Sequence, residues 1–345
     1  MVLHCLGLNH RSAPARVREV AALDDERQRQ MLARLGRCPG LDESQAKELT
    51  VLSTCNRVEL YAVLSTESPG PLRTMLSGSS GPDEAVLAPH LYHLTAVDAA
   101  RHLLRVAAGL DSLVVGEPQI LGQVAEAHML AQRLGAAGPI LTRLFQAALH
   151  TGKRARAETT ISRNPATVSS LAVALAAREV GDVAAAQVLV IGAGEMAEHM
   201  VEALHKRRVS SITVINRTPA RAQELAARWH ATPRPFTDLE GALHRADIVL
   251  SSTGAPHTVV HTQAVRRALR ARAGRPMVLI DIAMPRDVDP EVGRLSGVRL
   301  YDLDGLQARV ADTLDVRSGQ VPLVEALVEE EVAVFSSWLE DLSLV

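Results

Sequence analysis

Six consecutive residues in the middle of the chain have the types and spacing of a dinucleotide-binding turn: Gly192, Ala193, Gly194, Glu195, Met196 and Ala197. In this GxGxxA pattern the first glycine permits a tight turn, and the second lets the backbone approach a pyrophosphate. The final alanine still allows the following helix to pack closely on the preceding strand. Since the first amides of that helix point at the phosphates, the motif predicts a dinucleotide site.

The residues after the next apolar strand indicate which dinucleotide binds. NAD-binding domains commonly place an acidic residue there for the ribose 2′-hydroxyl, whereas this chain has Asn216, Arg217 and, one turn later, Arg221. An arginine can form a charge-assisted bond to a 2′-phosphate, which an acid would repel. The pattern therefore favours NADPH, and a nucleotide-free domain with surface arginines is the alternative.

Cysteine provides the second candidate for chemistry. Cys5, Cys38 and Cys55 form neither a CxxC pair nor a Cys/His cluster with zinc spacing, so we predict no metal site. Three scattered cysteines are typical of a reducing, cytoplasmic setting. The start of the chain does not resemble a signal peptide, and the apolar segments are too short to span a bilayer, so no membrane association is expected.

Cys55 lies in a short polar segment, Thr-Cys-Asn-Arg, between two apolar runs. By residue type alone, a cysteine is more often a small buried structural residue. A loop between strands is, however, a common place for catalytic groups, and Arg57 could favour the thiolate. With a hydride cofactor, a thiolate could attack an activated acyl group, and the resulting thioester could be reduced to an aldehyde.

The apolar patterns predict the elements that must position these residues. Strands at 2–8, 48–53, 58–64 and 90–94, with helices at 24–36 and after Thr95, suggest a split, ferredoxin-like sheet of the β-α-β-β-α-β type with added helices. Thr95 and Asp98 form a capping signature for the helix that follows. Residues 112–181 are helical in pattern and carry a basic segment, most simply a solvated helix face and alternatively a contact for RNA phosphates: Lys153, Arg154 and Arg156.

From residue 187 onward, strands alternate with helices, which predicts a doubly wound parallel sheet. A long amphipathic helix begins near Pro322, and its apolar stripe needs a partner surface on this chain or on a second protomer: Leu323, Leu327, Val334, Phe335, Trp338, Leu339 and Leu342. We therefore predict an α/β protein of 345 residues with a ferredoxin-like α+β catalytic domain and added helices (1–160), a Rossmann-type NADP-binding domain (161–312) and a long helix (313–345). The net charge of −2 argues against a wholly basic nucleic-acid binder.

Several sequence blocks resemble one known family. "STCNRVELY", "GLDSLVVGEPQILGQV", "GKRARAET", "IGAGEMAE", "NRTPARA" and "DIAMPRDVDPEVG" are similar to glutamyl-tRNA reductase, in the family's order and at its spacing. The resemblance runs from the "GLNHRSAP" loop to the final helix. It implies NADPH-dependent reduction of glutamyl-tRNA to glutamate 1-semialdehyde, the first step of tetrapyrrole synthesis.

The resemblance also implies roles for individual residues. The family's nucleophile maps onto Cys55, and His102 matches a histidine needed for activity, as a proton donor or acceptor. The glutamate-recognition residues map onto a set around the two specific motifs: Thr54, Asn56, Arg57, Ser112, Glu117, Pro118, Gln119 and Gln123. Gln119 and Gln123 lie on one side of a predicted helix. Arg57 could hold the side-chain carboxylate, and Ser112 or Glu117 could accept from the α-amino group.

The implied partners are glutamyl-tRNA as substrate and the downstream glutamate-1-semialdehyde aminomutase. Family members continue past Val345 into a helical dimerisation domain, so the resemblance does not extend the family's homodimer to this chain. One alternative function is a small-molecule dehydrogenase of the shikimate dehydrogenase type, which leaves Cys55 unexplained. Another is a non-enzymatic regulator that binds nucleotide or transfer RNA.

Overall fold

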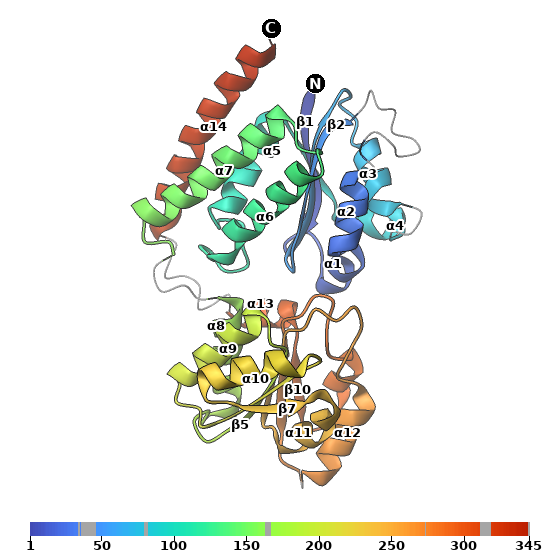
Figure 1. Ribbon diagram of the computed structural model, residues 1–345, viewed down its shortest axis with the longest axis vertical. Helices are drawn as coiled ribbons and strands as arrows, with labels where there is room; N and C mark the ends of the chain where they lie inside the picture. The colour runs from blue at the N-terminus through green and yellow to red at the C-terminus, as the bar shows by residue number, and fades with distance from the viewer. Residues whose placement is uncertain are drawn as a thin grey trace. The chain divides into compact units, whose positions relative to one another are not determined.

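The structure is a computed structural model, which describes residues 1–33, 35, 46–78, 82–162, 167–272, 274–310 and 319–343. Cys38 lies outside the described residues. The chain divides into two compact units, residues 1–165 with 314–345 and residues 166–313 (Figure 1). The roles expected of domains 1–160, 161–312 and 313–345 stay predictions.

The first unit contains an antiparallel sheet in the order β2-β3-β1-β4. Its described strands are β1 (Val2–Asn9), β2 (Ala46–Ser53), β3 (Arg57–Leu64) and β4 (Tyr92–Thr95). Both faces are covered, since every residue of β3 is buried. This is the split arrangement predicted from the order of apolar runs, so the ferredoxin-like sheet is confirmed.

Helices cover the two faces of this sheet separately. Leu6 and Leu8 of β1 face one core, with α1 (Ala15–Ala21), α2 (Asp25–Ala33), α3 (Gly70–Ser77) and α4 (Glu84–Leu87). Leu3 and Cys5 face the other, with α5 (Ala96–Ala107), α6 (Gln119–Arg133) and α7 (Pro139–Glu158). This period-two alternation places side chains at odd positions of β1 and β3 beneath α5.

The start of α5 differs from the predicted capping pattern. Thr95 is the N-cap residue, but its side chain makes no capping hydrogen bond. Asp98 instead pairs with Arg101, at 2.7 Å. The expected start of the helix is therefore confirmed, whereas the expected capping contact is wrong.

The long helix α14 (Val321–Ser343) packs on α5 and α7 of its own chain. The predicted stripe is confirmed at Leu327 and Phe335, which are buried, and at Trp338 and Leu339, which pack against the core, whereas Leu323, Val334 and Leu342 are exposed. The residues that enter the core with α5 and α7 repeat about every four positions: Val324, Val328, Val332 and Phe335. Ion pairs with arginines of α5 and α7 fix the same orientation: Arg101–Glu329, Arg105–Glu325 and Arg154–Glu330.

The second unit contains a parallel sheet in the order β10-β9-β8-β5-β6-β7. The described strands are β5 (Gln187–Ile191), β6 (Ser211–Asn216), β7 (Thr232–Pro235), β8 (Ile248–Ser251), β9 (Met277–Asp281) and β10 (Val298–Tyr301). The order reverses between β5 and β8, which is where open α/β sheets bind their ligands. The predicted doubly wound sheet is confirmed.

The helices of this unit are α8 (Val168–Val180), α9 (Glu195–Lys206), α10 (Pro219–Trp229), α11 (Leu239–Arg245), α12 (Thr262–Ala271) and α13 (Leu303–Val310). Strand β7 was not predicted, because all four of its residues are exposed and two are prolines, so it shows no apolar pattern. Among the described helices of either unit, none has the length and apolar character needed to cross a membrane.

Candidate active site

Cys55 lies in the tight connection between β2 and β3. The turn is closed by the amide of Thr54, which donates to the Arg57 carbonyl at 2.8 Å, and by the Thr54 hydroxyl, which accepts from the Asn56 amide at 3.2 Å. The amide of His10, after β1, donates to the Asn56 carbonyl at 2.9 Å. The Cys55 side chain is half-buried in this turn. These hydrogen bonds thus fix the backbone of the turn that carries the sulfur.

The surroundings of Cys55 disfavour the thiolate in the free protein. Burial and the negative charge of Glu117 raise the pKa of the Cys55 thiol to about 11, against the opposing charges of Arg18 and Arg57. The predicted effect of Arg57 therefore has the right sign but does not dominate. The thiol holds its proton at neutral pH, so forming the nucleophile requires that proton to leave.

Arg57 is fully buried and ion-paired, unlike the substrate-facing cation expected from the sequence. Its Nη1 donates to Glu59 at 2.6 Å and its Nη2 to Asp111 at 3.0 Å. Burial opposes the charge, but these two carboxylates raise the pKa of Arg57 above its usual range. The guanidinium charge is thus balanced inside the protein. Of the side-chain nitrogens of Arg57, Nε has no hydrogen-bond partner among the described residues.

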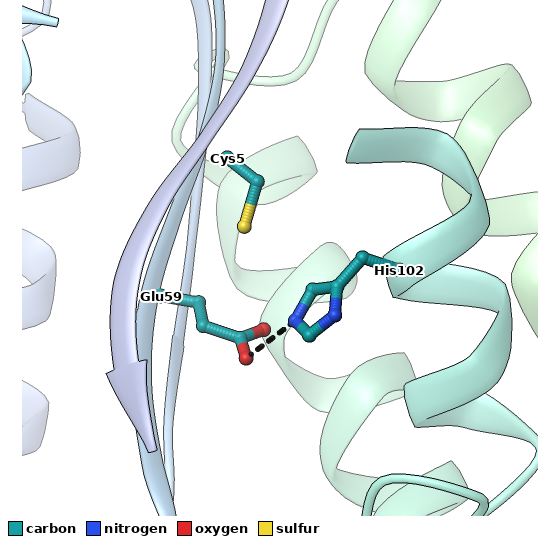
Figure 2. A group of neighbouring side chains, drawn as sticks. All are labelled: Cys5, Glu59 and His102. Carbon is teal, nitrogen blue, oxygen red and sulfur yellow. Dashed lines mark hydrogen bonds and ion pairs between the residues drawn. The ribbon is translucent and has the colours of Figure 1, made fainter. Parts of the chain in front are cut away.

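Glu59 is the centre of a buried hydrogen-bond network that reaches His102. Besides Arg57, its carboxylate accepts from the hydroxyls of Tyr61 and Tyr92, each at 2.6 Å. It also accepts from Nε2 of His102 at 3.0 Å (Figure 2). Burial alone would raise the pKa of Glu59, but the charges of Arg57 and His102 hold it well below its usual range. The predicted catalytic histidine is therefore linked to the base of the Cys55 turn.

Cys5, Glu59 and His102 also bring three possible metal-ligand atoms within 4.8 Å of one another (Figure 2). Glu59 already accepts hydrogen bonds from four side chains. Burial raises the pKa of the Cys5 thiol well above its usual value, so it remains protonated. The donor set of these described residues therefore fits a hydrogen-bond network better than a metal centre.

The loop between α5 and α6 brings the second predicted motif to the same place. Asp111 accepts from Arg57 and from Nδ2 of Asn9, at 3.1 Å, and pairs with Arg11. Ser112 follows it and is buried, as is Glu117, whose charge acts on Cys55. The structure thus joins the Thr54–Arg57 turn to the loop that carries Ser112 and Glu117.

Close packing fixes the end of this loop. Gly116 has a φ of 78°, and a Cβ there would lie 2.2 Å from the Ile161 carbonyl oxygen, so no other residue fits. Arg156 donates to the carbonyls of Glu117 and Pro118, each at 3.3 Å. The expected solvated face is therefore wrong for Arg156, which supports the site, and for Arg154, which is ion-paired with α7 and α14 glutamates. Lys153 is exposed as expected.

Pro118 is the N-cap residue of α6, and Gln119 begins the helix. Gln119 and Gln123 lie one turn apart, both half-buried. Their predicted place on one side of a helix is confirmed, and their contact with substrate stays a prediction.

The dinucleotide fingerprint lies at the carboxyl end of β5, next to the point where strand order reverses. Gly192 has a φ of 116°, and a Cβ there would lie 2.8 Å from the Ser252 carbonyl oxygen. Gly194 is the N-cap residue of α9, and a Cβ there would meet open space. Ala197 is buried against the sheet. The first glycine is thus required by packing, whereas the second is left open for a ligand to approach, as a dinucleotide requires.

The predicted 2′-phosphate residues follow the neighbouring strand β6. Asn216 ends that strand, and its side chain donates to the Thr218 carbonyl at 3.0 Å. Arg217 and Arg221 are both exposed. On the other side of the fingerprint, the hydroxyl of Ser252, after β8, is buried without a partner among the described residues. The fingerprint is therefore flanked by two exposed cations and by an unused hydroxyl.

Sequence reasoning missed the charged residues that support the site. Arg18 of α1, Glu59 of β3 and Asp111 are all buried, and each bonds to the Cys55 turn or to Arg57. Glu59 could have been noticed as an acid in an otherwise apolar strand. Arg18 and Asp111 gave no such signal, because their partners are distant in sequence.

Comparisons with known proteins match both units. Residues 6–159 match the family model "Glutamyl-tRNAGlu reductase, N-terminal domain", and residues 174–309 match the model "Shikimate / quinate 5-dehydrogenase". The second model covers only the unit of residues 166–313. It therefore indicates that this unit shares its fold with shikimate dehydrogenases, and it does not extend to the first unit, which carries Cys55.

Curated relatives match the whole chain. The chain is 40% identical to glutamyl-tRNA reductase of Syntrophotalea carbinolica, over 98% of this chain and 75% of the relative. It is 38% identical to glutamyl-tRNA reductase of Bacillus subtilis, over 99% of this chain and 74% of the relative. The solved structure of glutamyl-tRNA reductase from Methanopyrus kandleri matches 99% of this chain and 81% of that chain, with 37% identity and a TM-score of 0.53. The chain therefore belongs to the glutamyl-tRNA reductase family.

Proposed function

We propose that this protein reduces glutamyl-tRNA(Glu) to glutamate 1-semialdehyde with NADPH, by way of a thioester on Cys55, and that it releases the transfer RNA. The observation that carries the proposal is the Cys55 turn. It holds one half-buried thiol near the loop that carries Glu117, in a chain that matches this family along its whole length. This reaction is the first step of tetrapyrrole synthesis.

The chemistry at Cys55 follows from the nature of the substrate. The glutamyl carbonyl is already activated as an ester of a ribose hydroxyl, so the sulfur can attack it without a further activating group. The new carbon–sulfur bond replaces the carbon–oxygen bond to the ribose, and the thiol proton is transferred to the departing hydroxyl. The nucleotide, when bound, would supply the hydride that reduces the thioester to the aldehyde. The carbon–sulfur bond breaks in this step, and the Cys55 thiolate leaves and takes up a proton to regenerate the thiol.

Recognition of the glutamyl group is proposed for the residues that surround this turn: Thr54, Asn56, Arg57, Ser112, Glu117, Pro118, Gln119 and Gln123. Glu117 is buried near the thiol, so it can accept from the α-ammonium group. Binding that cation would cancel the repulsion that Glu117 exerts on the thiolate, so substrate would make the thiol more acidic. Arg57 would bind the side-chain carboxylate by exchanging one of its two carboxylate partners.

His102 is proposed as the proton donor or acceptor. Because the Glu59 carboxylate can only accept, it holds Nε2 of His102 as the donor in their hydrogen bond. Glu59 therefore sets the orientation of the ring.

Recognition of the 2′-phosphate of NADPH is proposed for Arg217 and Arg221, together with Asn216, the last residue of β6. The two exposed cations follow β6, the strand that pairs with β5, and the fingerprint Gly192–Ala197 follows β5. A 2′-phosphate would bring its charge to them, while the phosphates of the dinucleotide would lie at the start of α9. Transfer of the aldehyde to an aminomutase is a further proposal that follows from family membership, whereas the family's homodimer is not proposed for this chain.

The proposal is tested by the reaction itself. The protein is mixed with glutamyl-tRNA and NADPH, and the aldehyde is trapped and quantified. Cys55→Ser is expected to produce none, while Cys5→Ser serves as a matched control, because Cys5 is buried in the sheet. Aldehyde formation by Cys55→Ser at the normal rate would contradict the proposed route.

A further inference from the structure

Arg18 is a buried cation next to the Cys55 turn. It lies on α1, where Ala15, Val17 and Ala21 are also buried, and only 2% of it is exposed. Removing a charged group from water is costly unless hydrogen bonds and charges replace the solvent. The contacts of Arg18 therefore indicate what its burial achieves.

Those contacts converge on the turn that carries the thiol. Nη1 of Arg18 donates to the carbonyl of Cys55 at 2.7 Å and lies 3.4 Å from the side-chain oxygen of Asn56. Its Nε donates to the Ala13 carbonyl at 3.2 Å. One planar guanidinium thus ties the loop before α1 to the backbone of Cys55, 37 residues away.

Arg57, the other buried arginine of the site, is placed differently. Arg57 is the first residue of β3, and its side chain pairs with Glu59 and Asp111, which balance its charge. Arg18, by contrast, hydrogen-bonds to the backbone of Cys55 itself. Arg57 therefore belongs to the network beneath the turn, whereas Arg18 fixes the turn itself.

Resting on the proposed role of Cys55 as nucleophile, we propose that Arg18 is a positioning residue for it. The guanidinium fixes the carbonyl of Cys55 and holds a positive charge near the sulfur, where the thiolate must form. A cation that is already in place needs no reorganisation when negative charge develops.

The charges around the thiol agree with this assignment. The groups that act on it are Glu117 from the loop before α6, Arg18 from α1 and Arg57 from β3. Burial and Glu117 raise its pKa, and of the two arginines Arg18 lowers it more. His10, whose amide bonds to the same turn, has its pKa lowered to about 4, first by burial and then by Arg57, so it is neutral near pH 7.

The test measures the thiol directly. Iodoacetamide alkylation of the full chain is followed from pH 7 to 11, and the tryptic peptide that contains Cys55 is quantified by mass spectrometry. Because the midpoint lies at or above the upper end of this range, it is obtained from the rise of the rate below it, scaled to the rate of a free cysteine thiolate. Because only the thiolate reacts, the pH midpoint of this rate reports the acidity of Cys55, whether or not the residue is catalytic. Turnover of glutamyl-tRNA is measured on the same samples.

Four variants separate charge from packing. Arg18→Met is expected to shift the midpoint upward by about one pH unit and to slow alkylation at pH 8 about tenfold. Arg18→Lys keeps the charge but loses the planar guanidinium that donates to two carbonyls at once. Its midpoint should therefore stay near that of the wild type while kcat falls. Glu117→Gln should shift the midpoint downward. Arg16→Met, at an exposed position of the same helix, should change neither quantity.

The outcomes distinguish this inference from the proposed function. If Arg18→Met and Arg16→Met share the wild-type midpoint, or if Arg18→Lys shifts it as far as Arg18→Met, the role of Arg18 is refuted. Should Arg18→Met fail to fold, the Arg18→Lys comparison still decides, because loss of kcat at an unchanged midpoint is its specific signature. Normal turnover by Cys55→Ser would refute the proposed function, while the alkylation result for Arg18 would still stand.

Discussion

Replacing Glu59 with glutamine tests the network beneath the candidate site most sharply. The carboxylate is completely buried and accepts from four side chains: Arg57, Tyr61, Tyr92 and His102. Three of these donors bond to Oε1, which the amide oxygen of glutamine can replace. The new amide group would then face only the Tyr61 hydroxyl, which can rotate to accept. Glu59→Gln therefore removes the charge while it conserves most of the hydrogen bonds.

The magnitude follows from what remains around Arg57. Breaking a buried ion pair costs about 3–5 kcal/mol, because it leaves an uncompensated charge. Asp111 still pairs with Arg57 at 3.0 Å in this variant, so we expect the free energy of unfolding of the first unit to fall by about 2–4 kcal/mol. The exposed pair of Glu329 and Arg101 provides the control, and Glu329→Gln should cost about 1 kcal/mol or less.

The assay is urea unfolding followed by tryptophan fluorescence. Trp338 lies in the first unit and Trp229 in the second, so a Trp229→Phe background reports the first unit alone. The pH dependence provides a second check. Since the folded-state pKa of Glu59 is depressed, its contribution is present above the unfolded pKa and is lost as the pH falls below it. The difference from Glu59→Gln should therefore shrink in acid, and equal stability of Glu59→Gln and Glu329→Gln at pH 7 would refute the reasoning.

Three further predictions concern other parts of the chain. Burial and the charge of Asp287 raise the pKa of Asp281 to about 7, so the folded state keeps a proton that the unfolded state releases, and stability of the second unit should fall by up to about 1.4 kcal/mol per pH unit between pH 4 and 7. Asp281→Asn should flatten this slope in thermal unfolding. Phe335→Ala should destabilise the first unit by about 3–5 kcal/mol in urea unfolding, whereas exposed Val334→Ala should change little. In titrations of the two nucleotides, Arg217→Ala should weaken NADPH binding at least tenfold more than NADH binding, and equal losses would contradict the 2′-phosphate assignment.

Apolar patterns predicted most strands and both sheets because buried positions of a strand are occupied mainly by apolar residues, which are visible in the sequence. Strand β1 alternates between two cores, and the long buried runs of β5, β8 and β9 could only belong to a covered parallel sheet. Strand β7 left no such record because all its residues are exposed. For the long final helix, the pattern predicted its existence and part of its buried face, including Leu327 and Phe335. It did not predict the exact orientation, since the arginines of α5 and α7 that pair with the helix are remote in sequence.

The candidate site was predicted in part for the same reason. Cys55 and the fingerprint glycines have recognisable local motifs. The charges that support them do not, because each pair joins distant segments: Asn9 with Asp111, Arg18 with Cys55, and Glu59 with His102. A buried arginine and an exposed one look alike in a sequence. Their different roles become visible only when the fold places a carbonyl or a carboxylate beside the guanidinium.

The central claim is that Cys55 carries the glutamyl group during turnover. The direct measurement mixes the protein with glutamyl-tRNA in the absence of nucleotide, quenches with acid after one turnover, and maps the glutamyl adduct by mass spectrometry. The account predicts a thioester on Cys55 that disappears, with formation of aldehyde, when NADPH is added before the quench. An adduct on another residue, or aldehyde formation by Cys55→Ser at the wild-type rate, would contradict it.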